Sequence, residues 1–177
     1  ETLKTSDAKF PRIPVKFLFA SEGFTEEWRE DVLSRANYSY KPYHAINLYG
    51  CTDLLILGHE TPISIFLKKE AESNRIVGDR LFGVRSTANI FQYNPMFRYV
   101  ESVGGTLLFT AAGGVPLIRF DIGNAGEVVN YRDIQDVLSR QKTGIPGWQL
   151  PFIILKGRNN YVLEFHLAHI DPEYIRQ

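Results

Sequence analysis

The fold class of this chain is decided by residues 13–20 (IPVKFLFA), 25–36 (TEEWREDVLSRA) and 45–49 (AINLY). The first stretch is rich in β-branched and aromatic residues, which predicts a buried strand. In the second stretch Thr25 suits a helix N-cap, and Trp28, Val32 and Ala36 recur at intervals of four, which predicts an amphipathic helix. The third stretch predicts another strand. Strand, helix and strand in this order indicate an α/β unit with a parallel strand pair.

The sequence pattern changes near residue 95, where we place a boundary. Before it, Thr61 and Pro62 suit the start of a helix over 61–73. After it, Val103-Gly104-Gly105 separates two strand-like runs and predicts a hairpin. The elements expected from the hairpin onward are strands at 97–102, 106–111, 116–122 and 127–130, a short helix at 131–140, and strands at 149–156 and 161–168. We therefore expect a mixed α/β and α+β fold, with part of an α/β subdomain at 1–95 and a β-rich, barrel-like subdomain at 96–156.

Composition narrows the functional classes. The 177 residues are 44% hydrophobic, which is sufficient for a real core. The 20 basic and 20 acidic side chains balance, so neither a nucleic-acid footprint nor an anionic membrane partner is indicated. No apolar run approaches the roughly 20 residues of a membrane-spanning helix. A single cysteine, Cys51, excludes an internal disulfide and favours a reduced, cytoplasmic setting.

Tyr49-Gly50-Cys51-Thr52-Asp53 is the first candidate site, because it ends a predicted strand. Ligands in α/β sheets bind beyond the carboxyl ends of strands. A tyrosine there can stack on a base, a glycine lets the backbone approach a ligand, and a threonine hydroxyl can hold a phosphate oxygen. The Asp53 carboxylate can bind Mg²⁺ that bridges phosphates. The alternative is an ordinary polar turn after a buried strand.

Two further segments follow. Pro116-Leu117-Ile118-Arg119-Phe120-Asp121-Ile122-Gly123-Asn124 ends in a Gly-Asn pair, which could equally be a plain β-turn. Gly157-Arg158-Asn159-Asn160 could be a solvated loop. Taken in order with the first candidate site, the segments resemble motifs of the adenylate-forming (acyl-CoA synthetase-like) superfamily, in the branch related to phenylacetate–CoA ligase.

The resemblance implies a nucleotide site. Tyr49 would pack on adenine with Gly50 beside it, Thr52 would contact the α-phosphate, and Asp53 would bind Mg²⁺, which makes Thr52 and Asp53 the implied catalytic residues. Asn124 stands where the family has a ribose-binding Asp, and Arg158 would also bind the ribose. The loop Ser21-Glu22-Gly23 stands where the family places its adenine-contact loop. Residues 157–177 would be the hinge and the truncated start of a C-terminal lid domain.

The function implied is therefore that of an ATP-dependent, carboxylate-activating ligase. Its cofactors would be ATP/AMP and Mg²⁺, with coenzyme A as co-substrate and a small carboxylic acid, at family level an aromatic one, as substrate. We expect the chain to be part of a longer protein and to be inactive alone, because the phosphate loop and lid lysine of the family are missing from it. Monomer and homodimer both stay open.

Two rival interpretations are retained. Asn124, Asn160 and Leu167 replace residues usual in the family, which favours a non-catalytic nucleotide-binding or regulatory protein on a ligase scaffold. A globular interaction domain with coincidental motifs is the third. Metal binding by His59, His166 or His169 and nucleophilic catalysis by Cys51 are disfavoured, and Trp28 and Trp148 are interpreted as packing residues.

Overall fold

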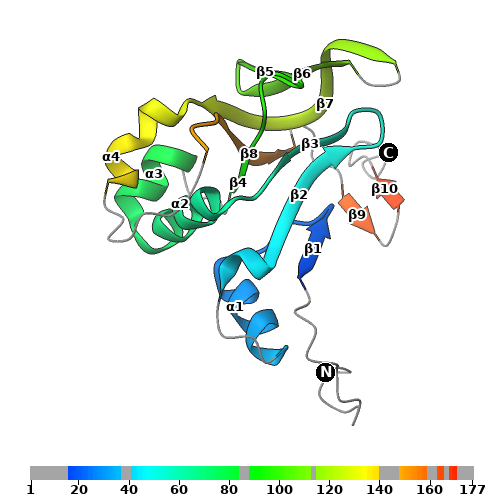
Figure 1. Ribbon diagram of the computed structural model, residues 1–177. Helices are drawn as coiled ribbons and strands as arrows, with labels where there is room; N and C mark the ends of the chain where they lie inside the picture. Colours follow the sequence, from blue (N-terminus) through cyan, green and yellow to red (C-terminus); the bar gives the residue numbers. More distant parts are fainter. Residues whose placement is uncertain are drawn as a thin grey trace.

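The computed structural model describes residues 16–36, 41–83, 88–112, 115–139 and 148–158, and the backbone of 163–165 and 168–170. Its framework is one eight-stranded sheet with the strand order β1-β2-β3-β4-β8-β7-β6-β5 (Figure 1). The strands of this sheet are β1 (Phe17–Ala20), β2 (Ala45–Cys51), β3 (Leu55–His59), β4 (Asn89–Gln92), β5 (Arg98–Val103), β6 (Thr106–Ala112), β7 (Pro116–Val129) and β8 (Phe152–Arg158).

Six helical segments and two short strands complete the described part of the chain. Figure 1 shows α2, α3 and α4 together beside the central strands, and α1 at the far end beside β1 and β2. The helical segments are α1 (Glu26–Arg35), α2 (Pro62–Ser73), α3 (Arg75–Phe82) and α4 (Gln135–Leu138), with the 3₁₀ turns Pro42–His44 and Tyr131–Ile134. A separate antiparallel pair is formed by β9 (Leu163–Phe165) and β10 (Ala168–Ile170).

The first unit of the fold is the predicted one. β1 and β2 are parallel, with Ala20 level with Leu48, and α1 connects them. Thr25 caps α1, accepting a hydrogen bond from the Trp28 amide at 3.2 Å. Thr61 caps α2, whose first residue is Pro62. The strand-helix-strand prediction is thus confirmed for residues 17–20, 26–35 and 45–51. Every other pairing in the sheet is antiparallel.

The sheet curls so that its edge strand β5 approaches the β2–β3 turn. Arg98 of β5 donates a hydrogen bond from Nη2 to the Leu54 carbonyl at 3.3 Å, although β5 is five strands from β3 in the sheet order. The curl encloses an apolar cluster that we call the barrel core. Its buried members are Tyr49, Leu54, Leu57, Phe91, Tyr93, Val100, Leu107, Phe109, Ala111 and Ile153.

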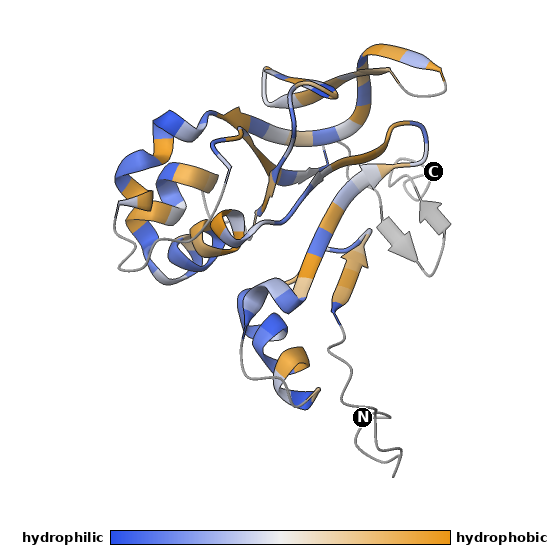
Figure 2. Cartoon of the chain, in the orientation of Figure 1, coloured by the Kyte–Doolittle hydropathy of each residue, from blue (hydrophilic) through white to orange (hydrophobic). Residues whose placement is uncertain are grey.

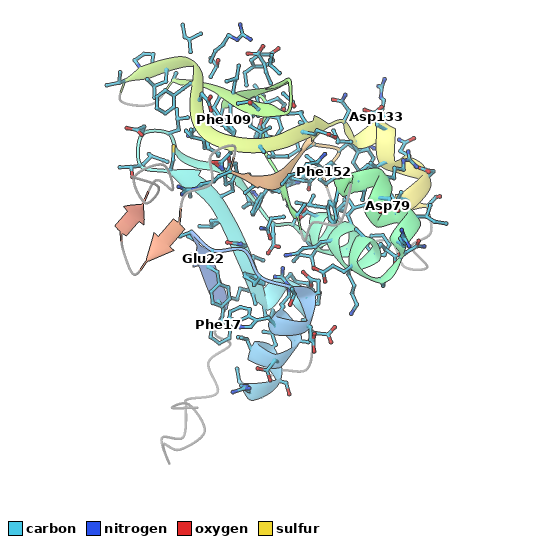
Figure 3. The ribbon with its side chains drawn as sticks, turned by 180° about the vertical axis from the view of Figure 1, so that it is seen from behind. Phe17, Glu22, Asp79, Phe109, Asp133 and Phe152 are labelled. Atoms are coloured by element: carbon cyan, nitrogen blue, oxygen red, sulfur yellow. The ribbon has the colours of Figure 1, made fainter. Side chains whose placement is uncertain are left out.

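A second apolar cluster, the helix core, lies under α2, α3 and α4. The two cores use alternate residues of the same strands, since side chains along a strand point to opposite faces. Ile90 belongs to the helix core and Phe91 to the barrel core. On β8, Phe152 and Ile154 belong to the helix core and Ile153 to the barrel core. In Figure 3, Phe109 marks the barrel core and Phe152 the helix core.

Five predicted elements need correction. The strands expected at 116–122 and 127–130 are one strand, β7, because the bulge between Ala125 and Gly126 bends the strand without ending its pairing. The helix expected at 131–140 is a 3₁₀ turn followed by one short α-helical turn. The strand expected at 149–156 begins only at Phe152. The continuous strand expected at 161–168 is replaced by β9 and β10, which pair antiparallel with Phe165 opposite Ala168.

The buried face of α1 also differs from expectation. Its buried residues are Glu26, Arg29 and Leu33, whereas Trp28 is 42% exposed. In Figure 2, α1 is coloured mostly hydrophilic, yet it packs against the sheet. Trp148 is 64% exposed, so neither tryptophan is a core residue, although Trp28 packs against Phe19 and Phe24 and Trp148 packs edge-on against His59. The predicted division at residue 95 stays a prediction, although one sheet carries β4 and β5 on either side of it.

Candidate functional site

The Tyr49–Asp53 segment forms the end of a β-hairpin between β2 and β3. The ladder shifts between Tyr49 and Gly50, which pair with Gly58 and Ile56. A Cβ on Gly50 would lie 2.2 Å from the Leu55 carbonyl oxygen, so the hairpin closes this tightly only with glycine there. Thr52 and Asp53 follow in the turn, and both are exposed. The turn therefore offers a hydroxyl and a carboxylate to solvent.

Tyr49 is a member of the barrel core and is only 7% exposed. Its ring is stacked on Phe91 at 5.3 Å between centroids and meets Phe109 edge-on at 5.9 Å. Its hydroxyl is buried and has no hydrogen-bond partner in the described part of the chain. Stacking of adenine on Tyr49 stays a prediction, and it would require one of these phenylalanines to move.

The second and third motifs meet across the β7–β8 ladder. Asn124 of β7 is the cross-strand partner of Arg158 of β8. Asn124 is half-buried and follows Gly123, whose φ of 76° is left-handed and whose amide donates a hydrogen bond to Asp121 Oδ1 at 2.7 Å. The two residues that the resemblance places on the ribose are therefore neighbours, although 34 positions separate them in the sequence.

Electrostatics connects this pair with the β2 hairpin. Burial raises the pKa of the Tyr49 hydroxyl, and Cys51 adds to the rise. The positive charge of Arg158 acts in the opposite direction and lowers that pKa. Ile122 of β7 and Leu155 of β8 pack against the barrel core that contains Tyr49, which brings β2, β7 and β8 to one region.

The Ser21-Glu22-Gly23 loop lies at the same end of the sheet as the β2 hairpin. β1 ends at Ala20, which is level with Leu48, so Ser21 and Tyr49 are the next residues along two parallel strands. Carboxyl ends of adjacent parallel strands are where α/β sheets bind ligands. Ser21, Glu22 and Gly23 are all exposed, and Figure 3 shows Glu22 beyond the end of the strand that carries Phe17. Ser21 has a φ of 77°, an unusual conformation for a residue other than glycine.

A metal at this site would have few protein ligands. Among the described residues, no group of three or more His, Cys, Asp or Glu side chains could hold an ion. Thr52 and Asp53 are both exposed, and Mg²⁺ is commonly held by one or two carboxylates plus substrate phosphates, so Mg²⁺ binding by Asp53 stays a prediction. His59 Nδ1 lies 3.0 Å from the Glu60 carbonyl oxygen, and the side chains of His166 and His169 lie outside the described residues.

Sequence reasoning missed a set of buried charges, which we call the charged cluster: Glu26, Arg29, Glu60 and Lys68. Arg29 Nη2 lies 2.7 Å from Glu60 Oε1, and Arg29 Nε lies 2.9 Å from Glu26 Oε2. Arg29 also donates to the Ala45 carbonyl, and Glu60 Oε2 accepts from the Asn47 amide at 2.7 Å. The cluster ties α1 to β2 and to the end of β3.

Burial perturbs these groups in opposite directions. Desolvation lowers the pKa of Lys68, while Glu60 and Glu26 oppose that shift. Desolvation also raises the pKa of the Glu60 carboxyl, against the effect of Arg29. Burial would lower the pKa of Arg29, but Glu60 and Glu26 outweigh it, so its pKa is raised and Arg29 stays charged. A possible sequence signal was the spacing of Glu26, Arg29 and Leu33, which share one helix face.

A separate groove of about 380 Å³ lies between α2 and α3. Its lining includes Glu72, Arg75 and Asp79, and none of the predicted site residues. Figure 3 shows Asp79 on the helices, away from Glu22. The groove therefore adds nothing to the predicted nucleotide site.

Comparison with known proteins does not identify the chain. No protein-family model matches its sequence, and the search of curated proteins finds no significant match. Among the described residues, no helix is long and apolar enough to cross a membrane.

Proposed function

We propose that this chain is part of an ATP-dependent carboxylate-activating ligase and carries its nucleotide-binding residues. The observation that carries the proposal is the cross-strand pairing of Asn124 with Arg158 on β7 and β8, two strands that also pack against the core containing Tyr49. Residues from β2, β7 and β8 that resemble three motifs of one family thus gather in one region.

The chemistry proposed is a two-step acyl transfer. In the first step, a carboxylate oxygen of the acid attacks the α-phosphorus of ATP, and pyrophosphate leaves. In the second, the thiol sulfur of coenzyme A attacks the acyl carbon, and AMP leaves. No covalent bond to the protein forms, so catalysis would rest on positioning and charge stabilisation.

In the first step, Tyr49 would pack on adenine with Gly50 beside it. Asn124 and Arg158 would hydrogen-bond the ribose, and Thr52 would hold an α-phosphate oxygen. Asp53 would hold Mg²⁺, which would neutralise charge on the phosphates when bound. The Ser21–Gly23 loop would border the adenine. We propose a small, aromatic acid as substrate, and no turnover by these 177 residues alone.

Carboxylate-dependent ATP–pyrophosphate exchange by the intact parent protein, across a panel of aromatic and aliphatic acids, tests this function. Asp53→Ala should lower the exchange rate roughly 100-fold, the size of effect seen when one group that stabilises charge in a transition state is lost. Asp79→Ala is the matched control, because Asp79 is an exposed aspartate on α3. It should leave the rate unchanged.

The possible outcomes separate the two nucleotide-binding functions. Exchange with any acid would support the ligase. Absence of exchange with every acid, together with retained ATP binding, would favour the non-catalytic regulatory alternative. Absence of ATP binding would contradict both. Asn124→Asp should tighten ATP binding, because a carboxylate makes stronger hydrogen bonds to ribose hydroxyls than an amide does.

A further inference from the structure

The Ser21–Phe24 segment combines an exposed outer surface with a buried support. Ser21, Glu22 and Gly23 face solvent, and Ser21 holds a left-handed φ of 77°. Exposed loops with such backbone angles keep them only when their surroundings determine the conformation. The residues beneath this segment supply that support, and all three come from other elements.

Two backbone carbonyls of the segment are bound by buried side chains. Asn47 of β2 donates from Nδ2 to the Glu22 carbonyl at 2.9 Å, and Lys68 of α2 donates from Nζ to the Phe24 carbonyl. Asn47 is 3% exposed and Lys68 is 1% exposed. Burying a lysine ammonium costs free energy unless hydrogen bonds compensate it, and here one of those bonds is made to a loop carbonyl.

A third residue holds the middle of the segment. Asn89 of β4 accepts from Lys68 Nζ at its Oδ1, 3.0 Å away. The same side chain lies against Gly23, where a Cβ would come 2.3 Å from Asn89 Nδ2. Lys68 and Asn89 together therefore fix how closely the segment lies against the sheet.

The Phe24 ring completes the attachment. The Lys68 Nζ lies 5.2 Å from its centroid and the Arg29 guanidinium carbon 4.7 Å, both within cation–π range. Trp28 contacts the same ring at 4.8 Å between centroids. The charged cluster thus reaches the loop through Lys68 and Arg29, and Trp28 reports on the position of Phe24.

We propose that Lys68 is a positioning residue that, through Asn89 and the Phe24 carbonyl, holds the Ser21–Gly23 loop in the conformation that recognises the purine base. The inference rests on the proposed function, because it assigns a base to the loop. It adds a group that never touches the nucleotide. If Lys68 only stabilised the fold, its replacement would weaken the binding of all nucleotides equally. If Lys68 positions the loop, its replacement would weaken the binding of adenine nucleotides selectively.

Two measurements on the 177-residue chain test the proposal. The first is the dissociation constants of AMP and UMP for the wild type, Lys68→Met and Lys69→Met. Lys69 is the matched control, since it is the next lysine of α2, is exposed, and pairs with Glu30 at 2.7 Å. The second is amide hydrogen exchange over 21–25, with Trp28 fluorescence recorded in a Trp148→Phe background.

We expect Lys68→Met to weaken AMP binding roughly tenfold, which corresponds to the loss of one charged hydrogen bond, and to leave UMP binding unchanged. It should also speed exchange over 21–25 and shift Trp28 emission to longer wavelength. Lys69→Met should change none of these. Should Lys68→Met not fold, Asn89→Ala removes the same support and should give the same pattern.

Three results would overturn the inference. Equal weakening of AMP and UMP would make Lys68 a purely structural residue. Faster exchange over 21–25 with unchanged AMP binding would show that the loop does not recognise the base. Unchanged exchange and emission would show that Lys68 does not hold the loop. If the wild type bound neither nucleotide, the proposed function would fail, and the support of the loop by Lys68 would be judged from exchange alone.

Discussion

The barrel core and the charged cluster are both buried, but they are held together in different ways. The barrel core is a set of apolar side chains from six strands, the β2–β3 turn and the β4–β5 connection, packed around Tyr49 and Phe109. The charged cluster holds Glu26, Arg29, Glu60 and Lys68 by directed hydrogen bonds at the junction of α1, α2 and β2. Loss of one apolar group costs its transfer free energy and leaves a small cavity, but it leaves no unpaired charge. Loss of one charge leaves its partners buried and unpaired.

The barrel core and the charged cluster support different parts of the predicted site. The barrel core encloses the Tyr49 ring and supports the β2, β7 and β8 strands that carry the predicted site. The charged cluster sits below the Ser21–Phe24 loop and holds it through hydrogen bonds. The apolar region thus supplies the framework, while the polar region fixes the one loop of the site that precedes a helix.

The largest expected loss of stability follows replacement of Arg29, which pairs with both carboxylates of the cluster. Arg29→Met should lower the free energy of unfolding by about 4 kcal/mol, because Glu26 and Glu60 lose their buried partner. Urea denaturation followed by circular dichroism measures it. Arg35→Met is the control, since Arg35 pairs with Asp31 on the exposed side of the same helix, and its urea midpoint should not change. Equal midpoints for Arg29→Met and wild type would contradict the account.

A double-mutant cycle gives the next effect. Glu60→Gln removes the charge that Arg29 faces at 2.7 Å. The combined Arg29→Met and Glu60→Gln variant should be about 2 kcal/mol more stable than the sum of the single changes predicts. Simple additivity would mean that the cluster is not a coupled unit, and the contrast with the barrel core would disappear.

The smallest effect is expected in the barrel core. Ile153 is fully buried there, and Ile153→Val should cost about 1 kcal/mol of unfolding free energy, the usual cost of one buried methylene group. Thermal unfolding with the matched Ile56→Val change, at an exposed residue of β3, provides the comparison. A loss as large as that of Arg29→Met would show that the barrel core is no more tolerant than the cluster.

Much of the framework followed from local pattern. Helix caps at Thr25 and Thr61 and the Gly104-Gly105 hairpin are local features, so the elements they start or join were predicted correctly. The strand β3 was missed because its five residues carry no clear alternation beside the β2 turn. β7 was divided because Gly123-Asn124 has the composition of a turn, whereas the structure keeps both residues in the strand.

The geometry of the site was less predictable than its residues. The pairing of Asn124 with Arg158 depends on the bulge at Ala125 and Gly126, which sets the β7–β8 register and has no simple sequence signature. The charged cluster was missed because Glu26 and Arg29 have the composition of an exposed helix face. The spacing of Glu26, Arg29 and Leu33 places them on one helix face, but which face is buried depends on Glu60 and Lys68, which are distant in sequence.

The most direct test of the account is a titration of AMP with Mg²⁺ into the ¹⁵N-labelled chain, followed through backbone amide chemical shifts. We expect shifts that saturate together at Ser21–Gly23, Gly50–Asp53, Gly123–Asn124 and Arg158, and none in the α2–α3 groove. Shifts confined to that groove, or no saturable shifts at all, would contradict a nucleotide site at the meeting of β2, β7 and β8.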